Sequence, residues 1–183
     1  DLAFLDETML NRATELALDI GVRYAPGNFT VEDYTRSAAQ REQNGEIAVA
    51  MSFIGSAIAL TDRAGLWTEY ARLTLIAAEK ERSRGASLRS DALSAAINGY
   101  LYASDAGTRA SALYQMALAL EGMYEGRRMI PALRLAQDAQ PREEAADLLE
   151  HAINRYGFRI TGNTVESDLA EPRICAEFSE PLV

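Results

Sequence analysis

Residues 42–48 read EQNGEIA, and residues 124–127 read YEGR, with Ala132 and Leu133 shortly after. In both stretches an acidic or polar residue and a glycine come before a small residue on the apolar face of a new helix. This order is typical of the turn into the second helix of a helical hairpin. The two stretches therefore predict that the chain folds from helical hairpins.

Apolar residues recur every three or four positions on both sides of these turns, as they do in amphipathic helices. Glycine, proline and capping residues divide this pattern into about eight helices joined by short loops. The first four predicted helices are 2–20, 30–43 with Thr30 as its cap, 46–60, and one from 66 to the charged run 79–84. The fifth is capped by Ser87 or Ser90 and carries Leu101, and the sixth runs from about 108 to 124. The seventh has Pro131 in its first turn and ends near 139, and the eighth is 141–156.

The pattern predicts a mainly α fold, an array of antiparallel helical hairpins that is tetratricopeptide-like with degenerate repeats. Short loops favour packing between neighbours in sequence, and we expect a right-handed array. Leu113, Leu120, Leu149 and Ile153 are expected to be nearly fully buried. An irregular helical bundle is the alternative, because the full repeat signature is absent.

A different pattern begins after Tyr156 and divides the chain into a helical domain, 1–156, and a short β segment, 157–183. Residues 158–161 and 164–166 alternate around Gly162-Asn163, which predicts a β-hairpin with a two-residue turn. A further strand, 172–178, places Ile174, Ala176 and Phe178 on one face. This strand is expected either to join the hairpin and lie against the last helix, or to pair with a second copy and form a dimer.

Composition argues against several classes of function. The 183 residues carry a net charge of −9, which disfavours nucleic acid as a partner. Lys80 is the only lysine and does not lie in a Gly-Lys-Ser/Thr step, which excludes a Walker loop and any chemistry that needs a second lysine. One His and one Cys cannot form a zinc site of Cys and His ligands. The sequence therefore predicts no enzyme activity and no cofactor. No apolar run reaches the roughly 18 residues that span a bilayer, so any membrane tether is expected before Asp1.

The single histidine has the best placed neighbours for chemistry. His151 shares one stripe of the last predicted helix with Glu143 and Asp147, and three such side chains could hold a metal. No second ligand helix and no nucleophile elbow are visible, so a solvated helix face is the favoured interpretation. Neither a catalytic nor a metal-binding residue is therefore predicted.

Aromatic residues and the lone cysteine supply two weaker candidates. A peptide groove could be lined by Trp67, Tyr70, Tyr100, Tyr114 and Tyr124. At helical spacing, aromatic residues more often belong to the core. Cys175 could be reactive or could pair with a cysteine elsewhere, but a free thiol without a role is favoured.

Three stretches near the end of the chain resemble bacterial alpha-2-macroglobulins. Residues 130–137 read IPALRLAQ, residues 153–159 read INRYGFR, and residues 172–182 read PRICAEFSEPL. They are similar to the region just before, and entering, the first macroglobulin domain of that family. The resemblance implies that 157–183 begin a macroglobulin-like β-domain and that the helices belong to the amino-terminal region.

The resemblance implies a context and no functional residue. The family consists of large envelope proteins that trap proteases with a bait segment and a Cys–Gln thioester. Cys175 is followed by Ala176, Glu177 and Phe178, so it does not match the thioester motif. The implied role is a non-catalytic spacer or docking segment of a periplasmic or envelope protease inhibitor. A free-standing adaptor that binds a peptide or protein, and a helical enzyme with an unrecognised pocket, remain alternatives.

Overall fold

The computed structural model describes residues 1–158, 160–166 and 173–178. These residues form eight helices and two strands, and the fold is mainly α with helical hairpins, as predicted. The elements are α1 (Glu7–Arg23), α2 (Val31–Gln43), α3 (Ile47–Ile58), α4 (Ala64–Lys80), α5 (Gly85–Tyr102), α6 (Ala106–Gly122), α7 (Gly126–Ala139), α8 (Glu143–Tyr156), β1 (Ile160–Glu166) and β2 (Arg173–Phe178).

Three predicted helix starts are wrong, and one predicted cap is confirmed. Helix α5 begins at Gly85, so neither Ser87 nor Ser90 caps it. The first helix begins at Glu7, because Asp6 accepts a hydrogen bond from the Met9 amide at 3.0 Å and caps it. Pro131 lies inside α7, which already begins at Gly126, instead of in a first turn. Thr30 caps α2, as the sequence predicted, and the structure adds a reciprocal capping box with Asp33.

The turns at 42–48 and 124–127 share one backbone geometry, but the residues that correspond in the two turns are not their glycines. Glu46 donates to the Arg41 carbonyl and Glu125 donates to the Leu120 carbonyl, both at 2.9 Å, as in a Schellman turn. The residues with positive φ are Gly45, at 78°, and Tyr124, at 65°. Tyr124, and not Gly126, is therefore the equivalent of Gly45.

Gly126 has a separate role in packing. A Cβ atom at this position would come 2.6 Å from the Tyr156 ring, so the glycine makes room for the end of α8. The Tyr156 hydroxyl then donates to Glu121 at 3.2 Å and ties α8 to α6. The same residue type thus relieves backbone strain in one turn and admits a neighbouring side chain beside the other.

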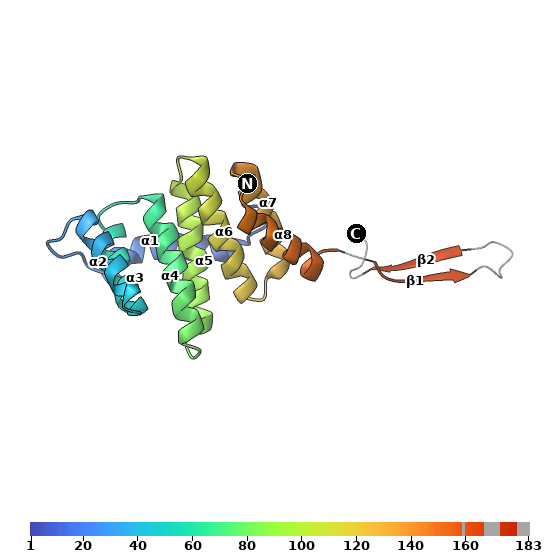
Figure 1. The fold of residues 1–183 in the computed structure, drawn as a ribbon, viewed down its shortest axis with the longest axis horizontal. Helices are drawn as coiled ribbons and strands as arrows, with labels where there is room; N and C mark the ends of the chain where they lie inside the picture. The colour runs from blue at the N-terminus through green and yellow to red at the C-terminus, as the bar shows by residue number, and fades with distance from the viewer. Residues whose placement is uncertain (159, 167–172, 179–183) are drawn as a thin grey trace.

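Helices α2 to α8 pack as a row in which each helix contacts the next (Figure 1). Helix α1 departs from this order, because it packs against α5 and α3 in place of α2. Figure 1 shows α1 running behind the row, across the other helices. The prediction that all successive helices pair is therefore wrong for α1.

The predicted core is confirmed in α6 and wrong in α8. Leu113 and Leu120 are completely buried. Leu149 is only half-buried and Ile153 is 42% exposed. Among the helices α8 contacts mainly α7, so a single neighbour covers its apolar stripe, and Ala145 and Ala152 are the residues that it buries fully.

The two strands form an antiparallel ribbon in which Val165 pairs with Ile174 and Ile160 with Phe178. The predicted turn at Gly162-Asn163 is wrong, because both residues lie inside β1, next to a bulge between Ile160 and Gly162. The connection between the strands falls in 167–172, outside the described residues. The predicted strand does join a hairpin, but this hairpin projects beyond α8 instead of lying against it (Figure 1).

Candidate functional site

Helix α1 is held across the array by close approaches and one buried amide. Asn98 of α5 is buried and donates from Nδ2 to the Ala13 carbonyl at 2.9 Å. A Cβ atom at Gly55 of α3 would overlap the Tyr24 ring, which packs directly on the glycine. Helix α1 can therefore lie close to α3 and α5 because these helices present a glycine and a short polar side chain.

The end of α1 is fixed to α4 by a pair of tyrosines. The hydroxyls of Tyr24 and Tyr70 are 3.1 Å apart, and the ring centroids are separated by 5.9 Å in an edge-to-face arrangement. Burial raises the pKa of Tyr70 above its ordinary range, and the Tyr24 hydroxyl adds to the shift. Tyr70 therefore stays neutral, and the hydrogen bond between the two hydroxyls anchors the end of α1.

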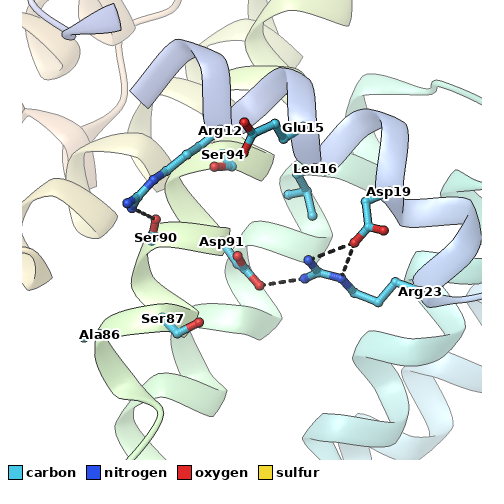
Figure 2. Close-up of a pocket in the computed structure, with 10 residues that line it drawn as sticks. All are labelled: Arg12, Glu15, Leu16, Asp19, Arg23, Ala86, Ser87, Ser90, Asp91 and Ser94. Atoms are coloured by element: carbon cyan, nitrogen blue, oxygen red, sulfur yellow. Dashed lines mark hydrogen bonds and ion pairs between the residues drawn. The ribbon is translucent and has the colours of Figure 1, made fainter. Parts of the chain in front are cut away.

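A polar cleft of about 750 Å³ remains between α1 and α5 (Figure 2). Helix α1 supplies charged side chains and one leucine, at helical spacing, and α5 supplies mainly serines. The lining residues are Arg12, Glu15, Leu16, Asp19, Arg23, Ala86, Ser87, Ser90, Asp91 and Ser94. Along the cleft, polar side chains of α1 and α5 face each other across open space, and the two helices are not in close contact there.

Both arginines reach across this cleft (Figure 2). Arg23 contacts Asp91 at 2.7 Å and Asp19 at 3.1 Å, while Arg12 donates to the Ser90 hydroxyl at 2.9 Å. Partial burial disfavours the charged form of Arg23, but the charge and hydrogen bond of Asp91 outweigh it and raise the Arg23 pKa. Arg23 is therefore charged and paired with two carboxylates, whereas Arg12 contacts only the neutral Ser90 hydroxyl.

Three polar side chains of the cleft, Ser94, Arg12 and Glu15, lack a hydrogen bond or an ion pair that they could form with a ligand. Ser94 is 4% exposed and lines the cleft, and its hydroxyl makes no hydrogen bond within the part of the chain that the structure describes. Neither Arg12 nor Glu15 forms an ion pair with any described residue. A second hollow of about 250 Å³ shares Arg12, Ser90 and Ser94, so the groove continues toward the start of α1.

The histidine candidate lies elsewhere. His151 is exposed on α8, with Nε2 3.7 Å from the Glu121 carboxylate of α6. Among residues 1–158, 160–166 and 173–178 no three His, Cys, Asp or Glu side chains come together as a metal site would require. Glu143, Asp147 and His151 are all exposed on α8.

The aromatic candidates do not form one groove. Trp67 and Tyr70 are buried in the core, Tyr100 and Tyr114 are partly buried, and Tyr124 is 98% exposed. Cys175 is exposed on β2 and pairs with Thr164 across the ribbon. The core interpretation therefore holds for Trp67 and Tyr70, and these side chains cannot line a peptide site.

Sequence reasoning missed the cleft between α1 and α5. A signal was present in the serines at 87, 90 and 94, which recur every three or four residues in an otherwise buried helix. The charged residues at 12, 15, 19 and 23 recur in the same way on α1. Each stripe by itself looks like an ordinary solvated helix face, and only the packing of α1 on α5 brings the two together.

Comparison with known proteins leaves the family open. No protein-family model matches the chain, and no curated protein matches it significantly. The helices of the described residues include none with the length and hydropathy needed to cross a membrane.

Proposed function

We propose that this chain is a non-catalytic helical segment of a bacterial alpha-2-macroglobulin-like protease inhibitor of the cell envelope, where it acts as a spacer or a protein-docking surface. The observation that carries the proposal is the ribbon at the end of the helical array. Its two faces differ in polarity, and its apolar face is uncovered.

The register of the ribbon produces that difference. The bulge at Gly162 places Ile160 and Val165 on the face that also holds Ile174 and Phe178. The opposite face carries Thr164, Cys175 and Glu177. On the apolar face Ile160, Val165 and Ile174 are each more than 60% exposed.

A ribbon of this kind needs a partner. Two isolated strands are marginally stable in water, and a hydrophobic face is normally covered by a further sheet or a helix. Within the ribbon the only aromatic contact described is the stack of Phe158 on Phe178, at 5.2 Å between ring centroids. This supports the assignment of 157–183 to the beginning of a macroglobulin-like β-domain.

The gene sequence downstream of codon 183 tests this proposal. We expect it to continue into β-domains and to encode a Cys-x-x-Gln thioester motif, because those features define the family that residues 130–137, 153–159 and 172–182 resemble. A downstream sequence without such β-domains and thioester would contradict the proposal. The purified chain alone should neither cleave nor inhibit a protease.

A free-standing adaptor is the second candidate, and the polar cleft favours it. A concave surface with converging polar groups is the usual form of a binding site. An adaptor requires a ligand in that cleft and no downstream β-domain. The two candidates are therefore separated by the same downstream sequence.

A further inference from the structure

We propose that the cleft between α1 and α5 binds an extended peptide segment that carries one acidic and one basic side chain two residues apart. The inference names the partner of the docking surface proposed above and rests on that role. It is argued from the length of the cleft, from its unpartnered polar groups and from the order of its charges.

The length of the cleft suits a short extended strand. Arg12 and Arg23 stand at its two ends, and eleven residues of α-helix rise about 16 Å. An extended peptide advances about 3.3 Å per residue, so about five residues lie between the two arginines. The volume of about 750 Å³ is within the range of sites that hold ligands of this size.

The serine wall can satisfy a peptide backbone. A serine hydroxyl can donate one hydrogen bond and accept others, so it can pair with either main-chain group of a peptide. Ser94 is 4% exposed and faces both hollows without a described partner. A main-chain carbonyl or amide in the cleft can supply that partner, and Ser87 one to two turns away lines the same wall.

The charged residues of the cleft determine which peptide side chains can bind there. Asp91 and Asp19 are both occupied by Arg23, so they do not attract a second cation strongly. Arg12 and Glu15 remain, one helical turn apart on the same side of α1. In an extended peptide residues i and i+2 point to the same side, about 6.6 Å apart. A peptide with an acidic residue and a basic residue at that spacing can contact Arg12 and Glu15 together.

Arg12 is also the side chain that must move when a ligand binds. Its hydrogen bond to Ser90 crosses the groove at the place where the two hollows share their lining. Exposed hydrogen bonds of this kind contribute little to stability, so a carboxylate can replace the Ser90 hydroxyl as the partner of Arg12. Leu16 is buried and forms the apolar floor that remains in place.

The test is a titration of the ¹⁵N-labelled chain with two blocked hexapeptides, Ala-Ser-Asp-Ala-Lys-Ala and Ala-Ser-Lys-Ala-Asp-Ala, because a strand can enter in either direction. The matched neutral peptides carry Asn and Gln in place of Asp and Lys. We expect at least one charged peptide to shift the amide signals of residues 12–23 and 86–94 saturably at millimolar concentration or below. The neutral peptides should bind at least about tenfold more weakly.

Variants identify the site. Arg12→Gln should weaken binding of the charged peptide about tenfold, and Ser94→Ala about fivefold. Arg84→Gln and Ser52→Ala change the same residue types outside the cleft and should leave the affinity unchanged. Unchanged amide spectra outside the cleft show that the variants are folded.

Three results would overturn the inference: no saturable shift with either charged peptide, equal binding of the neutral peptides, or unchanged affinity of Arg12→Gln. None of these results bears on the proposed family, which the downstream gene sequence tests separately. Conversely, specific peptide binding by a chain without downstream β-domains would support the adaptor and reject the inhibitor segment.

Discussion

Replacing Leu120 with Ala is expected to lower the free energy of unfolding by about 2–5 kcal/mol. Leu120 is completely buried in α6, which packs between α5 and α7, so the lost methyl groups leave a cavity that the neighbouring helices cannot easily fill. Urea denaturation followed by circular dichroism measures the change, provided that the slope of the transition is the same in both proteins.

Leu149→Ala is the matched control. The sequence predicted that Leu149 is nearly fully buried, like Leu120, but Leu149 is half-buried on α8, which has one main neighbour. We therefore expect a clearly smaller loss, since water already reaches part of the side chain. Equal losses for Leu120 and Leu149 would mean that α8 is covered in solution by something outside the described residues.

Gly55→Ala is expected to destabilise the chain by about 1–3 kcal/mol, because an added methyl group overlaps the Tyr24 ring and forces α1 away from α3. Gly65→Ala is the control, since a Cβ atom at Gly65 meets nothing within 4 Å. That substitution should be neutral or slightly stabilising, because alanine favours helix more than glycine does.

A double-mutant cycle identifies the cause of the Gly55 effect. Tyr24→Ala removes the ring, and in that background Gly55→Ala should lose most of its cost. The coupling free energy is expected to be about 1 kcal/mol or more. A loss that persists in the Tyr24→Ala background would show that α1 does not lie across α3 as the structure has it.

Local patterns predicted the helices well, because each depends on residues close in sequence. The three-to-four residue period located the eight helices of the described residues, and the cap at Thr30 was predicted from the residue type at the helix start. The apolar face of β2 was also predicted correctly from alternation. In each of these cases the chemistry that decides the structure lies within a few residues.

Errors arose where one local pattern permits two structures. Gly162-Asn163 suits a hairpin turn, but Ile160 and Val165 share a face only if a bulge replaces the turn. The glycines at 45 and 126 appeared equivalent, whereas Tyr124 takes the positive φ of the second turn. The first case depends on the partner strand β2 and the second on Tyr156, which packs on Gly126. Neither lies in the short stretch of sequence around the glycine concerned.

The candidate site could not be predicted, because its two walls lie about 70 residues apart in sequence. Among the described residues, Asn98 is the one buried side-chain amide that joins α5 to α1, and the sequence around an asparagine in an apolar helix does not identify its partner. The position of α1 on α3 and α5 is determined by contacts between residues distant in sequence, and the cleft results from that packing.

Hydrogen exchange of the Ile174–Phe178 amides tests the central claim most directly, in this chain alone and in a longer product that includes the downstream sequence. If the ribbon belongs to a β-domain, its uncovered face makes these amides exchange rapidly in the chain alone and at least about a hundredfold more slowly in the longer protein. Slow exchange in the monomeric chain, unchanged in the longer protein, would show that the ribbon is complete by itself and would contradict the account.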